Sequence, residues 1–243
     1  MSELVSVTIE NEVAQVHLNR PEKLNAFNDE LVEALLAAVS DVRASDARLC
    51  VFRGEGKGFS GGFDLSGLED ASDGDLLLRF VRVEELLQTV YHAPFATLAL
   101  VHGACYGAAA DLVAACHWRI SSPDARFRLP GLRFGIVLGT RRLSETVGAD
   151  HARDLLLRDR PFAADEALSR GFINQILSIQ DWLQAIEQKR ASVTDLSSAA
   201  FAALCKRTQP DNRDADLAAL VRSASYPSLK ERLSAFLEQA ARR

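Results

Sequence analysis

The chain has 243 residues, of which 48% are hydrophobic and 25% are charged. This mix is typical of a soluble globular protein and excludes a fibrous or wholly disordered chain. Its 28 basic and 33 acidic residues leave a net charge of -5, which argues against a domain that binds nucleic acid. No apolar run approaches the roughly 18 residues of a membrane-spanning helix, and the N-terminal residues lack the pattern of a secretory signal. We therefore expect neither a membrane segment nor a nucleic-acid partner.

The cysteines and histidines bear on redox state and metal binding. The four cysteines show no C-x-x-C spacing, so we expect reduced, buried thiols in a cytoplasmic protein. The five histidines show neither H-x-x-x-H nor H-E-x-x-H spacing, so no metal site is expected.

The N-terminal half of the chain is expected to alternate strands and helices. Apolar residues that alternate with polar ones over residues 5–19 predict a β-hairpin, which ends before Pro21 because proline cannot donate to a strand ladder. Asn28 can cap a helix whose apolar residues recur at helical spacing from Leu31 to Val42. The other elements expected here are strands over 48–53 and 95–101, a polar loop over 64–75 and an amphipathic helix over 76–91.

The alternation continues in the C-terminal half. We expect helices over 108–116, 150–157 and 164–170 and strands over 119–121, 125–129 and 172–177. Strands and helices in this order indicate βαβ units with a mostly parallel sheet, and hence an α/β fold. From residue 180 onward the pattern is helical, so we divide the chain into a core over residues 1–180 and a helical region over residues 181–243.

Two glycine-containing turns follow buried strands, at residues 58–65 and 102–112. Glycine allows a positive φ or a close approach of the backbone to a ligand. A helix or turn that begins just after the glycines would leave unpaired N–H groups pointing outward. Two such groups that converge on one point would form an oxyanion hole, which stabilises the negative oxygen of an enolate. The alternative is that these glycines only form turns.

The two turns resemble motifs of one enzyme family. Residues 59–65 (FSGGFDL) resemble the F-x-x-G-x-D-L signature of the crotonase, or enoyl-CoA hydratase/isomerase, superfamily, and residues 102–112 (HGACYGAAADL) resemble its N-G-x-x-x-G-G-G-x-E-L segment. Residues 20–26 (RPEKLNA) are similar to the family's R-P-x-x-x-N-A start. Further similar segments lie, in the family's order, at residues 126–142, 164–176 and 228–238.

This resemblance implies a ββα-spiral core with a helical C-terminal trimerisation region, and an acyl-CoA thioester as substrate. The backbone N–H groups of Phe63 and Ala108 would hold the thioester oxygen. No metal or redox cofactor is implied, since CoA is itself part of the substrate. The resemblance also implies a homotrimer or a dimer of trimers, although the apolar stripe of residues 214–241 could pack on the chain's own core or on a neighbour. The substrate-binding residues implied by motif position are Lys23, Leu24, Asn25, Ala26, Gly61, Gly62, Asp64, Leu65, Gly107 and Gly131.

Two departures from the family pattern bear on the reaction. Family hydratases use two glutamates, and the matching positions here hold Asp111 and Gly131. Glycine cannot transfer a proton, whereas Asp111 is ionisable and can act as the acid/base. A single carboxylate is enough to move a proton between two carbons, so we predict an isomerase or an atypical hydratase. The alternatives are a catalytically silent acyl-CoA-binding or partner subunit, and a hydrolase or decarboxylase of a CoA ester.

Other side chains are candidates for the missing functions. Glu69 or Asp70 could replace the second carboxylate, and Arg133 or Arg141 could bind a carboxylate on the acyl group. Asp64 is expected to have a structural role as well, because aspartate at such a turn usually caps it. The residues expected to pack without a chemical role are His102, Cys105 and Tyr106.

Overall fold

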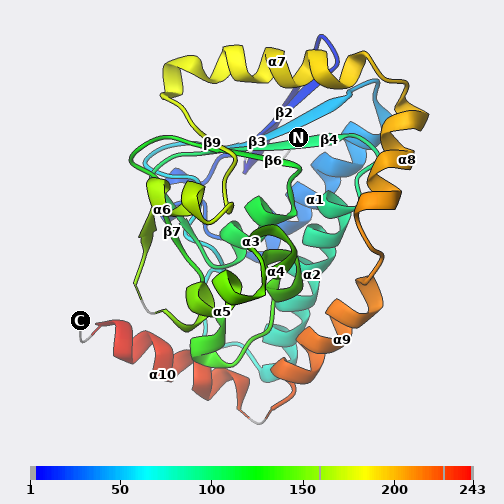
Figure 1. Cartoon of the computed structure of the whole chain (residues 1–243). Coiled ribbons are helices and arrows are strands. Elements are labelled where there is room, and N and C mark those ends of the chain that lie inside the picture. The colour runs from blue at the N-terminus through cyan, green and yellow to red at the C-terminus, as the bar shows by residue number, and fades with distance from the viewer. Residues whose placement is uncertain (1–3, 159, 227, 242–243) are drawn as a thin grey trace.

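A computed structural model of the chain describes residues 4–158, 160–226 and 228–241. Its larger sheet has six strands in the order β1-β2-β3-β4-β6-β9 (Figure 1). β1 and β2 form the predicted antiparallel hairpin, and each later strand pairs with its neighbour in parallel. The strands are β1 (Val5–Glu10), β2 (Val13–Leu18), β3 (Leu49–Gly54), β4 (Ala96–Val101), β6 (Trp118–Ser121) and β9 (Gln175–Ile176). The predicted α/β class with a mostly parallel sheet is confirmed.

Both faces of the larger sheet are covered. The helices α1 (Asp29–Ala44), α2 (Asp73–Tyr91) and α3 (Ala108–Ala115) contribute to the main apolar core. On the other face, side chains of β3 and β4 pack against Trp182 and Ile186 of α7 (Trp182–Thr194), which lies across the sheet in Figure 1. Burial on both sides explains why β3 and β4 are almost continuously apolar, as is usual for parallel strands.

The ends of the long helices are set by side-chain caps. The Asn28 side chain accepts a hydrogen bond from the Leu31 backbone N–H at 3.0 Å, so α1 begins where the sequence predicted. α2 begins at Asp73 and not at Leu76, because Ser72 and Asp75 form a capping box. The prediction of a loop as far as residue 75 was therefore too long.

A second, three-stranded sheet carries the turns of interest. It has the order β5-β7-β8, formed by β5 (Ala104–Tyr106), β7 (Arg126–Arg128) and β8 (Phe162–Ala163). β5 and the helix α4 (Thr140–Val147) were not predicted, since β5 lies inside a glycine-containing turn and α4 follows a glycine in a polar stretch. The strands predicted over 125–129 and 172–177 correspond to β7 and β9, and both are shorter than predicted.

The rest of the chain is helical, as predicted from residue 180 onward. α9 (Arg213–Ala224) packs beside α2, and α10 (Leu229–Ala241) lies at the end of the molecule opposite α7 (Figure 1). Leu229 and Leu233 of α10 are fully buried within this chain, so this part of the apolar stripe packs on the chain's own core. In the described part of the chain, no helix combines the length and apolar character needed to span a membrane. The remaining helices are α5 (Ala149–Leu157), α6 (Ala164–Ser169) and α8 (Ser198–Thr208), and the short 3-10 helices are η1 (Pro21–Lys23), η2 (Gly131–Phe134) and η3 (Ile179–Asp181).

Candidate functional site

The two glycine-containing turns pack directly against each other. The Ser60 N–H donates to the Ala104 carbonyl at 3.1 Å, and the Tyr106 N–H donates to the Ser60 carbonyl at 3.0 Å. Gly62 has a φ of +87°, and a Cβ atom added there would lie 2.2 Å from the Tyr106 carbonyl oxygen. Only glycine fits at this position, so the close approach of the two turns depends on it.

Each turn holds one backbone N–H group that has no hydrogen-bond partner among the residues that the structure describes. The Phe27 N–H donates to the Gly62 carbonyl at 2.7 Å, and the Phe27 carbonyl accepts from the Asp64 N–H at 3.1 Å. Phe63 lies between these two bonded residues, so its own N–H is on the opposite side of the segment. Ala108 is the first residue of α3, and its N–H therefore has no intrahelical acceptor. Within the described residues, neither N–H donates a hydrogen bond. This arrangement meets the first requirement of an oxyanion hole.

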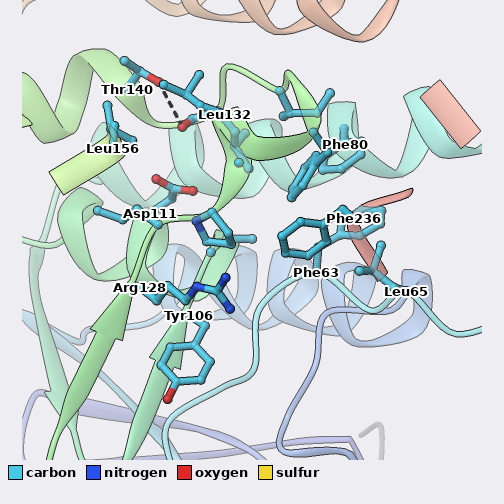
Figure 2. Close-up of a pocket in the computed structure, with 18 of the residues that line it drawn as sticks. Phe63, Leu65, Phe80, Tyr106, Asp111, Arg128, Leu132, Thr140, Leu156 and Phe236 are labelled. Carbon is cyan, nitrogen blue, oxygen red and sulfur yellow. Dashed lines mark hydrogen bonds between the residues drawn. The ribbon is translucent and has the colours of Figure 1, made fainter. Parts of the chain in front are cut away.

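A cavity of about 140 Å³ lies beside these two turns (Figure 2). Phe63, Ala108 and Asp111 line it, as do apolar side chains from five separate segments. These apolar residues are Leu65, Phe80, Leu129, Pro130, Leu132, Phe134, Ile136, Leu138, Leu156 and Phe236. A mostly apolar cavity with a few polar groups is the usual form of a small-molecule site.

Asp111 lies in the wall of this cavity, on α3. Asp111 is 6% exposed, and its carboxylate accepts no hydrogen bond from the described residues. Burial raises the pKa of Asp111 well above its usual value; nearby Arg142 opposes this effect and Glu84 adds to it. A carboxylate with a raised pKa in a cavity is typical of a general acid or base.

The segment that would carry a second carboxylate brings none into the cavity. Gly131 lines the cavity at the start of η2, and a Cβ atom added there would lie 3.2 Å from the Ile136 carbonyl oxygen. Glu69 and Asp70 are exposed and do not line the cavity. Among the described lining residues, Asp111 is the only acidic one.

Asn25 and Asp64 fix the backbone around the first turn. The Asn25 amide donates to three carbonyls, of Glu55 (2.9 Å), Gly58 (3.2 Å) and Phe59 (3.1 Å). The Asp64 carboxylate accepts from the Arg20 guanidinium at 2.6 Å and from the Ser66 N–H at 2.9 Å. Both side chains, predicted to bind substrate, are turned toward the protein.

The other residues of the predicted CoA-binding segment lie beside the first turn. The Gly61 N–H donates to the Leu24 carbonyl at 2.7 Å, while Lys23 is exposed and Ala26 is half-buried. Three further residues predicted to bind substrate line the cavity, namely Gly61, Leu65 and Gly107, whereas Gly62 is buried between the turns.

The arginines proposed to bind a carboxylated acyl group point elsewhere. Arg141 bonds to the Asp216 and Glu145 carboxylates, and Arg133 donates to the Leu157 carbonyl. Neither lines the cavity in the part of the chain that the structure describes, so the structure gives no support to a carboxylate-binding role for either arginine. Arg128 does line the cavity, although the sequence analysis did not name it as a site residue. The alternation of β7 could have indicated it, because Arg128 follows the buried Phe127 and neighbouring side chains on a strand face opposite sides of the sheet.

The side chains expected only to pack behave accordingly. Cys105 is fully buried, and burial raises the pKa of its thiol well above its usual value. A ring nitrogen of His102 pairs with the Gly56 carbonyl at 3.0 Å. Tyr106 lines the cavity, but Figure 2 shows its hydroxyl turned away from Asp111. All four cysteines are free and buried.

Comparison with known proteins relates this architecture to a family. Residues 8–242 match the profile of the family described as enoyl-CoA hydratase/isomerase. A solved structure described as an enoyl-CoA hydratase/isomerase of Bordetella parapertussis has a TM-score of 0.95 and 45% identity, covering 97% of this chain and 99% of the other.

Two curated relatives carry different activities in their names. A Mycobacterium leprae protein named as an enoyl-CoA hydratase is 34% identical over 185 residues, which is 73% of each chain. The mitochondrial Delta(3,5)-Delta(2,4)-dienoyl-CoA isomerase of Rattus norvegicus is 32% identical over 218 residues, which is 81% of this chain and 64% of the rat protein.

Proposed function

This chain belongs to the enoyl-CoA hydratase/isomerase family, and we propose that it shifts a carbon–carbon double bond within an enoyl-CoA thioester. The observation that carries the proposal is that Asp111 is the one acidic side chain among the described residues that line the cavity. Hydration needs water to be positioned and a carbon to be protonated, and family hydratases divide these tasks between two carboxylates. Isomerisation needs one group that takes and returns a single proton.

The Asp111 carboxylate takes a proton from the carbon beside the double bond. The electron pair of the broken C–H bond moves into the conjugated system and places a negative charge on the thioester oxygen. The N–H groups of Phe63 and Ala108 donate to that oxygen, which stabilises the dienolate. Asp111 then returns the proton to the carbon at the other end of the system. No atom is gained or lost, and nothing is oxidised.

The surroundings of Asp111 suit this role. Burial beside mostly apolar side chains raises the pKa of Asp111, which makes its carboxylate a stronger base than an exposed aspartate. The chain has relatives named as a hydratase and as a dienoyl-CoA isomerase, which is compatible with a shared enolate step, and the second name supports isomerisation.

The test is an assay of 3-enoyl-CoA and 2-enoyl-CoA in D2O by mass spectrometry. We expect interconversion of the two esters, little addition of water and no loss of the ester. Asp111→Asn should lower turnover by about 100-fold to 10,000-fold, the usual range for a general base. The matched control is Asp70→Asn, which alters an exposed aspartate outside the cavity. Near-normal turnover by Asp111→Asn would exclude Asp111 as the base.

A second candidate function is a catalytically silent acyl-CoA-binding subunit. Gly131 favours it, because the position of the second family carboxylate holds no proton-transferring group. This function predicts saturable binding of an acyl-CoA with neither isomerisation nor deuterium exchange. Release of free CoA in the same assay would instead indicate the hydrolase, and loss of CO2 the decarboxylase.

We also propose a cytoplasmic homotrimer, or a dimer of trimers. Family membership supports the trimer, and four free, buried cysteines support a reducing compartment. Light scattering should then give a mass of three or six times 26.6 kDa.

A further inference from the structure

The cavity is bounded on one side by four phenylalanines, which we call the aromatic wall: Phe63, Phe80, Phe134 and Phe236. The Phe63 and Phe80 rings stack with their centroids 4.0 Å apart. Phe80 lies 6.4 Å from Phe134, which lies 5.1 Å from Phe236, again between ring centroids. The rings therefore form a continuous series. Figure 2 shows Phe63, Phe80 and Phe236 on the side of the cavity opposite Asp111.

Contacts from three directions hold the aromatic wall in place. The Arg79 guanidinium lies 4.6 Å from the centroid of the Phe63 ring. Arg232 of α10 donates to the Phe134 carbonyl at 2.7 Å, and the Asp73 carboxylate accepts from the Lys230 N–H at 2.8 Å at the start of the same helix. These bonds fix α10, which carries Phe236, against η2 and α2. The wall is therefore built into the fold.

The space behind the wall is separate from the cavity. A second cavity of about 270 Å³ lies between α1 and α2. Of its described lining residues, only Phe63 also lines the first cavity, so the stacked Phe63 ring divides the two. An acyl chain that reached the aromatic wall could not continue into the second cavity without displacing this ring.

We infer that the site takes a compact acyl group of up to roughly six carbons, linear, branched or aromatic, and excludes long chains. The inference rests on the proposed acyl-CoA site and adds the substrate class. The limit on acyl size comes from the volume of the cavity, which is about 140 Å³. An apolar protein cavity of about 150 Å³ holds one benzene molecule, which has six carbons. Phe63, Phe80 and Phe236 line the side of the cavity opposite Asp111, where a longer chain would meet their rings.

Binding of saturated acyl-CoAs tests the inference without requiring turnover. In a site with an open end, each two added carbons would strengthen binding by roughly tenfold, because each buried CH2 contributes a constant gain. In a closed site the gain stops at the wall. By titration calorimetry we expect butyryl-, hexanoyl- and benzoyl-CoA to bind at least tenfold more tightly than decanoyl-CoA.

Variants of two adjacent residues on α10 assign the effect to the wall. Phe236→Ala should strengthen decanoyl-CoA binding at least tenfold, because it removes the ring that ends the series. The matched control is Leu237→Ala, since Leu237 is 38% exposed on the same helix and does not line the cavity. It should leave the preference for short chains unchanged.

The outcomes separate this inference from the proposed function. Affinity that rises steadily from butyryl- to decanoyl-CoA in the unaltered protein would overturn the compact-acyl inference, and would leave the isomerase proposal in place. A Phe236→Ala variant with the unaltered chain-length preference would remove the aromatic wall as its cause. Failure of every acyl-CoA to bind would overturn both proposals.

Discussion

Gly139 lies directly against the carboxylate of Asp111. A Cβ atom added at Gly139 would be 2.2 Å from Asp111 Oδ1 and 2.6 Å from its Cγ. Gly139 also has a φ of +64° and precedes the first turn of α4. The carboxylate of Asp111 is therefore placed by a glycine that is distant in sequence, in the segment between η2 and α4.

Replacing this glycine should disable the site. In Gly139→Ala the new methyl group displaces Asp111, and we expect kcat/KM to fall by about 100-fold, as a misplacement of about 1 Å can produce. The measurement is the isomerase assay, with the fold checked by circular dichroism. Gly67→Ala is the control, because Gly67 has a similar φ of +68° but no atom within 4 Å of an added Cβ. It should carry the same backbone strain and retain activity. Equal losses in both variants would contradict the contact argument.

Asp111 should make the folded chain less stable at neutral pH. Its pKa is raised by burial, so the folded state holds a proton that the unfolded state releases at about pH 4. Stability is therefore complete below that pH and declines as the pH rises through the raised pKa of the folded state. Asp111→Asn carries no charge and should avoid this loss. We expect its Tm to exceed that of the unaltered protein by about 2 °C or more at pH 8.

Thermal unfolding at several pH values checks this prediction. The difference in Tm between the two proteins should shrink as the pH falls to about 4 and below, because Asp111 then becomes protonated in the unfolded state as well. A difference that does not change with pH would show that Asp111→Asn acts through packing. The same group then limits stability and supports turnover, a trade-off that is common at active sites.

The pair formed by Arg142 and Glu84 should be essential to the fold. Both side chains are 1% exposed, and Arg142 donates to the two Glu84 oxygens at 3.0 Å and 2.5 Å. Glu84→Ala leaves the buried Arg142 guanidinium with a single remaining carboxylate partner among the described residues, Asp216 at 3.1 Å, so it should lower the free energy of unfolding by about 3 kcal/mol. Asp150→Ala, which breaks an exposed pair with Arg153, should have no measurable effect. Urea unfolding of both variants provides the comparison, and equal midpoints would refute it.

Local patterns in the sequence predicted much of the fold. Asn28 marked the start of α1, and the alternating residues of β1 and β2 marked the hairpin. The helix cap and the hairpin are both formed by residues that are close in sequence, so a local sequence pattern can predict them. β5 was missed because its three residues become a strand only by pairing with β7, more than twenty positions away.

The site was predicted in part, for the same reason. The motif resemblance pointed to Phe63, Ala108 and Asp111, and all three line one cavity. It could not show that Asn25 turns toward the protein, since its partners lie in another segment, whereas the capping role expected of Asp64 agrees with the bond that it accepts from the Ser66 N–H. Nor could it indicate the contact between Asp111 and Gly139, or the placement of Phe236, which depends on how α10 packs.

Gly131 offers a test of why this site should isomerise rather than hydrate. In Gly131→Glu, a second carboxylate enters the cavity at the position where family hydratases carry one. A Cβ atom there lies 3.2 Å from the Ile136 carbonyl oxygen, so η2 must shift by a few tenths of an ångström to admit it. We expect water addition to 2-enoyl-CoA to become measurable, at a rate at least tenfold above that of the unaltered protein. Gly131→Gln has nearly the same shape but cannot accept a proton, and it should show no such gain. If both variants gained hydration equally, pocket shape and not the missing carboxylate would explain the difference between the reactions.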